Sequence, residues 1–164
     1  MRWFRIRLST ATLAFVALSV LSTASAFACQ RVQGHLEETP APPASCLSPV
    51  GLCTVAQVFG NLKGEAHFTA ANIIVSGQTP TTGVVFVIGD SVLVDARLGS
   101  KQGTLISKNA AAFQSAGEGD LVDVQTIVGG TGDFIDATDS LRISGNFLPA
   151  TGGISSFEGT VCLP

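Results

Sequence analysis

The sequence predicts a single all-β domain, either a sandwich or a barrel, that follows an export signal. After Cys53, short runs of β-branched and other apolar residues recur at intervals of about 8 to 15 residues, separated by Gly, Pro, Asn and Asp. No segment sustains the periodicity of a helix, although Ala110 to Phe113 could form one helical turn. The four cysteines all follow the export signal, which is typical of a disulfide-bonded protein.

Residues 1–26 have the order of a secretory signal peptide. Three arginines lie within the first seven residues, an apolar run covers 11–21, and two A-x-A motifs end at Ala26 and Ala28. We expect cleavage after Ala26, or else after Ala28, with a retained N-terminal anchor as the alternative. The apolar run is shorter than the roughly 20 residues that cross a bilayer, and no later segment replaces it. We therefore expect a secreted or periplasmic protein that does not span the membrane.

Cleavage after Ala26 leaves Cys29, Cys46, Cys53 and Cys162, an even number that predicts two disulfides. Of the three pairings, we favour Cys46 with Cys53, which closes a short loop, and Cys29 with Cys162, which ties the N-terminal segment to the last strand. Lipid attachment to Cys29 would leave an odd number of cysteines, and residues 26–28 resemble a lipoprotein signal poorly, so we do not predict a lipoprotein. The cysteines and histidines lack metal-ligand spacing, and we predict neither a metal nor a cofactor.

Removal of the signal makes the chain acidic. It leaves six basic residues against twelve acidic ones, a net charge of −6. A nucleic-acid-binding protein needs a concentration of positive charge, so this class is excluded. The only tryptophan, Trp3, is also removed, and the chain has no tyrosine. Stacking sites for sugars or bases would therefore depend on Phe alone, which argues against carbohydrate binding.

Two regions follow the signal. Residues 27–53 are rich in Pro and polar residues without periodicity, which predicts an irregular N-terminal arm held by disulfides. Residues 54–164 form the predicted β domain, with strands over 54–60, 62–70, 72–77, 83–89, 91–98, 102–108, 119–128, 140–147 and 155–162. Residues 84–88 are apolar on both faces, which indicates that the outer face is covered by the arm or by a second subunit. The second of these possibilities predicts a homo-oligomer.

The segment Ile127-Val128-Gly129-Gly130-Thr131-Gly132-Asp133-Phe134, followed by Ala137 and Thr138, is the most distinctive in the chain. It resembles the G-G-T-G-x-F-x-x-A segment of plant dirigent proteins and of the wider allene oxide cyclase-like barrel family. The glycines of 60–64 and 103–105 and the run 157–160 look like other strands of that family, so the resemblance covers about residues 54 to 162. Asp139 stands where the dirigent pattern usually has Gly, and the pocket tyrosine of the plant cyclases has no counterpart.

The resemblance implies a single antiparallel, eight-stranded, calycin-like barrel whose interior can hold a small apolar molecule. Relatives cyclise an unstable oxygenated fatty acid derivative or guide the coupling of phenolic radicals, often as dimers or trimers. The glycine run also has a structural interpretation, because glycine permits a sharp turn after Val128 and Phe134 can plug the barrel end. A phosphate-binding loop would need a Lys and a following helix, which are absent from this sequence pattern.

Two pairs of residues are candidates for catalysis. Asp95 and Arg97 share one face of a strand with Ser91 and Leu93, and if this face lines the cavity, Asp95 could act as an acid or base beside Arg97. Glu65 and His67 also share a face, and His67 could act as a base at neutral pH. For Asp95 and Arg97 we favour the alternative, a solvated surface pair.

Five other aspartates are predicted in or near turns, where Asp usually accepts hydrogen bonds from the nearby backbone. Their spacing does not match a calcium loop. These residues are Asp120, Asp123, Asp133, Asp136 and Asp139.

The sequence thus favours an exported barrel that binds a small apolar ligand without turnover. One alternative is an isomerase or cyclase that acts by confining its substrate, because holding one reactive conformer can itself accelerate a reaction. A second alternative is an extracellular structural protein that forms oligomers. No nucleophile in a recognisable motif predicts a hydrolase.

Overall fold

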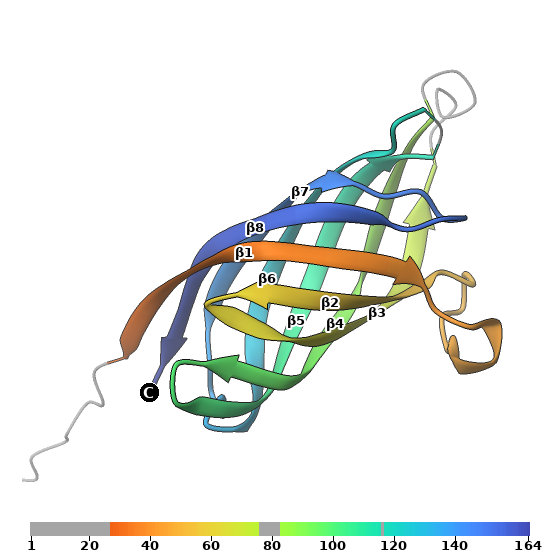
Figure 1. Cartoon of the computed structure of the whole chain (residues 1–164). Coiled ribbons are helices and arrows are strands. Elements are labelled where there is room, and N and C mark those ends of the chain that lie inside the picture. Colours follow the sequence, from red (N-terminus) through yellow and green to blue (C-terminus); the bar gives the residue numbers. More distant parts are fainter. Residues whose placement is uncertain (1–26, 76–82, 116) are drawn as a thin grey trace, which may run out of the picture.

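Eight antiparallel strands form a closed barrel in which each strand pairs with its neighbours in chain order (Figure 1). The computed structural model describes residues 27–75, 83–115 and 117–164, so the predicted signal peptide lies outside the described residues. The strands are β1 (Ala28–Pro40), β2 (Cys53–Gly60), β3 (Leu62–Ile74), β4 (Val84–Leu98), β5 (Lys101–Gln114), β6 (Asp120–Gly132), β7 (Asp139–Asn146) and β8 (Gly153–Leu163). The predicted all-β, eight-stranded barrel is confirmed.

Strand β1 closes the barrel, because it pairs with β2 on one side and with β8 on the other. This corrects the prediction that the whole of 27–53 is irregular. Only Val32 and Leu36 are large apolar residues facing the core from β1, and polar residues occupy its outer face, so the segment lacks the apolar density of a typical strand. Pairing along both edges, rather than local sequence preference, makes it a strand. The irregular part is limited to residues 41–52, which include the short 3-10 helix η1 (Pro43–Ser45).

Both favoured disulfides are present. Cys29 pairs with Cys162 across the β1–β8 seam, where the two residues are also register partners. Cys46 pairs with Cys53 and holds the irregular segment 41–52 against the start of β2. The described residues contain no free cysteine.

Several predicted strands merge into longer ones. The runs at 62–70 and 72–77 form β3 as far as Ile74, and 83–89 and 91–98 form β4, with β-bulges absorbing the irregularities. Residues 110–113 continue β5 and form no helical turn. No helix within the described ranges is both long enough and apolar enough to cross a membrane.

The glycine run after Ile127 is part of β6, which continues to Gly132 instead of turning after Val128. Gly129, with φ at 130°, lies at a bulge against β5 between Ile106 and Ser107. Gly130 lies so close to β5 that an added Cβ would stand 2.0 Å from the carbonyl oxygen of Thr104. Glycine is therefore needed at this position for close strand approach.

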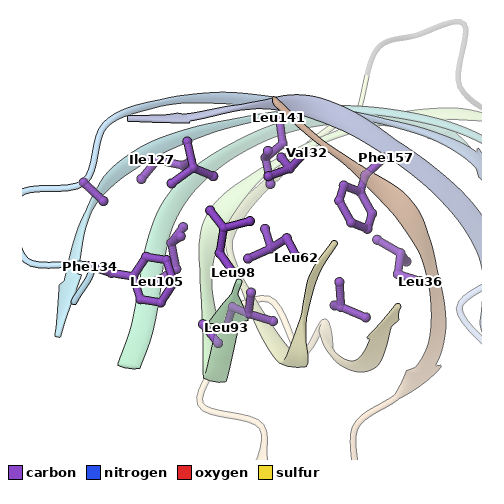
Figure 2. Packing of buried hydrophobic residues seen from close by; sticks show 14 of the residues in the cluster. Val32, Leu36, Leu62, Leu93, Leu98, Leu105, Ile127, Phe134, Leu141 and Phe157 are labelled. Carbon is purple, nitrogen blue, oxygen red and sulfur yellow. The ribbon is translucent and has the colours of Figure 1, made fainter. Parts of the chain in front are cut away.

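Apolar side chains fill the end of the barrel that contains the β2–β3, β4–β5 and β6–β7 turns, which we call the closed end (Figure 2). Phe134 is fully buried there, as predicted for a residue that plugs the barrel, and it packs with Leu62, Leu98 and Leu105. A second, smaller apolar cluster lies toward the opposite end, which we call the open end. Its members are Ala70, Val85, Val87, Phe113 and Phe147, with Leu52, Phe68, Ile73 and Leu121 packed against them.

Candidate functional site

A cavity of about 70 Å³ occupies the open half of the barrel and is partly open to solvent. Side chains from β1 to β7 and from the segments flanking them line it. The apolar part of the lining consists of Leu36, Leu52, Ala56, Ala66, Phe68, Val87, Ala111, Phe113, Leu121, Ile143 and Phe147. A cavity of about 40 Å³ lies toward the closed end and shares five lining residues with the first: Leu36, Ala66, Ser91, Gln125 and Ile143. Such volumes exceed what one water molecule requires.

Polar side chains form a layer between the two apolar clusters. Asp123 of β6 lies at its centre, where its Oδ2 accepts hydrogen bonds from Asn109 Nδ2 at 2.9 Å and from Gln125 Nε2 at 3.1 Å. The Ser107 hydroxyl lies 3.4 Å from Asn109 Oδ1 and 3.3 Å from Gln125 Oε1. The two amide groups are thus oriented so that their donors face the carboxylate.

The second oxygen of Asp123, Oδ1, is buried and forms no hydrogen bond of ordinary geometry with the described residues. The residue as a whole is only 7% exposed. Burial raises the pKa of this carboxyl above its usual range, although Gln125, Asn109 and nearby backbone N–H groups partly offset the effect. A buried carboxylate oxygen without a partner is costly, so this atom is the least satisfied acceptor of the layer.

Glu38 of β1 supplies a second carboxyl group to the cavity lining. Its Oε1 accepts a hydrogen bond from the Thr54 hydroxyl of β2. Burial raises the pKa of Glu38, the hydrogen bond from Thr54 lowers it, and the negative charge of Asp123 raises it further. The cavity therefore contains two interacting carboxyl groups, and its other lining side chains in the described residues carry no charge.

The alternation of the strands positions both carboxyl groups. Successive side chains of a strand point to opposite faces, so Leu121, Asp123, Gln125 and Ile127 face the interior while Val122 and Val124 face solvent. The prediction that Asp123 lies in or near a turn is therefore wrong. Asp133 and Asp139 do accept backbone hydrogen bonds beside turns, from Gln102 N and Ser140 N.

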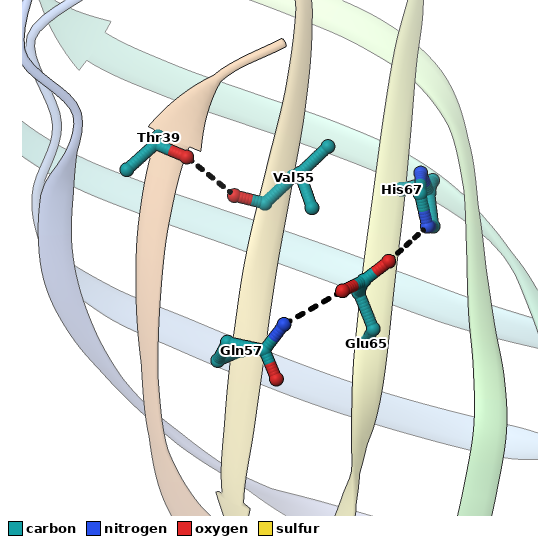
Figure 3. Close-up of polar contacts among 5 residues, drawn as sticks. All are labelled: Thr39, Val55, Gln57, Glu65 and His67. Atoms are coloured by element: carbon teal, nitrogen blue, oxygen red, sulfur yellow. Dashed lines mark hydrogen bonds and ion pairs between the residues drawn. The ribbon is translucent and has the colours of Figure 1, made fainter.

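Glu65 and His67 share the outer face of β3, as predicted, and interact directly (Figure 3). His67 Nε2 lies 2.8 Å from Glu65 Oε1, and Gln57 of β2 donates to Glu65 Oε2 at 2.7 Å. The side chain of His67 is 47% exposed and that of Glu65 is 41% exposed, and neither lines the cavity. The structure brings this pair together on the outer surface, and its catalytic role stays a prediction.

Asp95 and Arg97 are exposed on β4 and do not share the face of Ser91 and Leu93. A β-bulge lies between Leu93 and Ala96, where Val94 and Asp95 oppose the single residue Thr104 of β5. Asp95 has a positive φ of 49° at this bulge. The extra residue reverses the alternation, so Ala96 and Leu98 point inward with Ser91 and Leu93. The prediction that Asp95 and Arg97 share that face is therefore wrong.

Sequence reasoning did not single out Glu38 or Asp123 as site residues. Glu38 lies in a segment predicted to be irregular, and Asp123 was grouped with turn residues. The sequence of 121–127 did contain a pattern that indicates an inward-facing Asp123, because Asp123 and Gln125 alternate there with Val122 and Val124. In a barrel with an apolar outer face, this alternation directs the polar residues inward.

No group of three or more His, Cys, Asp or Glu in the described part of the chain is arranged to hold a metal ion. Asp139 has a φ of 97°, in the left-handed region that favours glycine. Neither a protein-family model nor a curated protein matches the sequence.

Proposed function

We propose that this chain is an exported β-barrel protein that binds a small, mainly apolar ligand in the open half of its barrel and releases it unchanged. The observation that carries the proposal is the partly open cavity, which combines an apolar lining with the carboxyl groups of Glu38 and Asp123. Small-molecule sites commonly have this composition, an apolar pocket with a few polar groups that orient the ligand.

Binding without turnover agrees with the chemistry of the lining. Its described side chains include no His, Lys, Arg or Cys, so the lining lacks the hydroxyl–histidine and thiol–histidine pairs that commonly form an activated nucleophile. Secretion or transfer to a periplasm is supported by the two disulfides, which persist in oxidising compartments. The charged, apolar and small-residue order of residues 1–26 supports the same location.

The test is ligand retention by the protein purified after export. Native mass spectrometry, followed by titration with a panel of lipophilic and phenolic compounds, should detect one bound molecule per chain. Ala66→Leu should weaken binding because Ala66 lines both cavities, while the matched change Gln57→Leu on the outer face should leave it intact. Absence of binding by every compound, or equal effects of the two changes, would contradict the proposal.

A second candidate is an allene-oxide-cyclase-like or dirigent-like isomerase or cyclase that acts by confinement. It is favoured by the two carboxyl groups that line the cavity, Glu38 and Asp123, because burial raises the pKa of both and a buried carboxyl group can act as a general acid or base. Conversion of an unstable oxygenated fatty acid or a phenolic substrate, lost in Glu38→Gln or Asp123→Asn, would establish this function. Loss of conversion in variants of Glu65, His67, Asp95 or Arg97 would instead locate catalysis on the outer surface.

A third candidate is assembly into a homo-oligomer, a dimer or trimer. An apolar face on the outside of β3 to β6 favours it, formed by the exposed side chains of Ile74, Phe86, Ile88, Val122 and Val124. Contiguous apolar surfaces of this kind commonly mark protein contacts. Light scattering after size-exclusion chromatography should give an oligomeric mass that falls to the monomer in Phe86→Lys. A monomeric wild-type protein would rule this assembly out.

A further inference from the structure

The charges of the cavity lining are unbalanced. Glu38 and Asp123 are acidic, and every other described lining residue is neutral. Both carboxyl groups are largely removed from water, and each disfavours ionisation of the other if it is charged. A buried carboxylate is stabilised by a cation placed against it, and no side chain of the described lining supplies one.

The polar layer also contains more hydrogen-bond acceptors than donors directed at them. The amide donors of Asn109 and Gln125 are directed at Asp123 Oδ2, and the Thr54 hydroxyl is directed at Glu38. Asp123 Oδ1, by contrast, is an acceptor without a hydrogen bond in a residue that is more than nine-tenths buried. Both carboxyl groups of the lining are acceptors, so a ligand that pairs with them must bring a hydrogen-bond donor.

The apolar part of the cavity can accommodate the rest of such a ligand. Phe68, Phe113 and Phe147 line the same cavity as the carboxyl groups, and the rings of Phe113 and Phe147 meet edge to face with centroids 5.8 Å apart. Aromatic rings bury hydrocarbon and also attract a nearby cation through their negatively polarised faces. The cavity of about 70 Å³ limits the ligand to a small molecule.

We propose that the ligand class is a small apolar amine, whose ammonium group binds the carboxylates of Asp123 and Glu38 while its hydrocarbon part packs against the three phenylalanines. The inference rests on the proposed function, because it specifies the chemistry of the molecule held in the same cavity. An ammonium group supplies two features, the positive charge that the lining lacks and hydrogen-bond donors for its carboxyl oxygens. A neutral alcohol supplies only the second, and a hydrocarbon supplies neither.

The test compares three probes of similar size, benzylamine, benzyl alcohol and toluene, by calorimetric titration of the exported protein at neutral pH. We expect benzylamine to bind at least about tenfold more tightly than benzyl alcohol, since hydrogen bonds to charged groups exceed neutral ones. Asp123→Asn and Glu38→Gln should each weaken benzylamine binding by about tenfold while changing the affinity for benzyl alcohol much less. The matched controls Asp120→Asn and Glu37→Gln remove the same charge from exposed neighbours and should leave both affinities within about twofold.

The outcomes separate this inference from the proposed function. If benzyl alcohol or toluene binds as tightly as benzylamine, the barrel binds apolar ligands but the amine class is wrong. If the controls weaken benzylamine binding as much as the cavity variants, the attraction is a general effect of net charge and the inference also fails. If none of the probes binds, and the lipophilic and phenolic panel does not bind either, the proposed function itself fails. The wild-type comparison decides between amine and alcohol even if a cavity variant does not fold.

Discussion

The two disulfides should contribute unequally to stability, because they close loops of very different length. Cys29 and Cys162 are separated by 133 positions, whereas Cys46 and Cys53 are separated by 7. A cross-link restricts the unfolded chain more strongly when it joins distant residues. The perturbation is a pair of double variants, Cys29→Ala with Cys162→Ala and Cys46→Ala with Cys53→Ala.

The chain-entropy relation for a closed loop gives about 5 kcal/mol for the longer separation and about 2.4 kcal/mol for the shorter one at 25 °C. Each variant truncates one buried cysteine, since Cys162 is 7% and Cys53 is 8% exposed. Truncation costs should therefore largely cancel when the variants are compared. The expected difference in free energy of unfolding is about 2.6 kcal/mol, with the Cys29–Cys162 variant less stable.

Urea denaturation of the exported protein and of both variants, followed by circular dichroism, measures these free energies of unfolding. The Cys29–Cys162 variant should unfold at the lowest urea concentration and should also lose the covalent link across the β1–β8 seam. Equal losses of stability in the two variants, or a larger loss in the Cys46–Cys53 variant, would refute the loop-entropy reasoning for this barrel.

Three other changes test the interior. Because the pKa of Asp123 is raised, its carboxyl group binds a proton more tightly in the folded chain than in the unfolded chain. The contribution of Asp123 to the free energy of unfolding is therefore most favourable below the ordinary pKa of 3.8, and it is lost as the pH rises through the folded-state pKa. Asp123→Asn should therefore raise the urea midpoint at pH 7, and this gain should disappear near pH 4; a constant gain at both values would contradict the assignment. Phe134→Ala should lower the free energy of unfolding by about 3 to 5 kcal/mol, because the side chain is fully buried in the closed end; a loss below about 1 kcal/mol would show that Phe134 is not a plug. Gly130→Ala should prevent the close approach of β6 to β5 and lower the thermal midpoint, whereas a wild-type midpoint would mean that the strands can separate there without cost.

Local patterning predicted most strands because their apolar density is high enough to be recognised without knowledge of the partners. Strand β1 is the exception, since its stability depends on pairing with β2 and β8. The resemblance to an eight-stranded barrel predicted the strand number, but it was assigned to a region beginning at residue 54. The eighth strand is supplied by the segment that the sequence analysis treated as an arm.

The site was less predictable than the fold, because one inserted residue changes which side chains face inward. The bulge at Asp95 reverses the alternation of β4, so strict two-residue periodicity wrongly placed Asp95 and Arg97 on the same face as Ser91 and Leu93. Asp123 is the opposite case. The alternation of β6 is regular there and directs Asp123 inward, although Asp is common in turns. Burial of a polar group becomes evident only once the barrel closes around it.

The most direct test of ligand binding in the barrel is an NMR titration of the ¹⁵N-labelled, exported protein with benzylamine, benzyl alcohol and toluene. Binding in the cavity predicts that the largest amide shifts occur at lining residues such as Ala66, Ala111 and Asp123, and that they saturate with one ligand per chain. Shifts confined to the outer-face residues Gln57, Glu65 and His67, or no saturable shifts with any of the three compounds, would contradict the account.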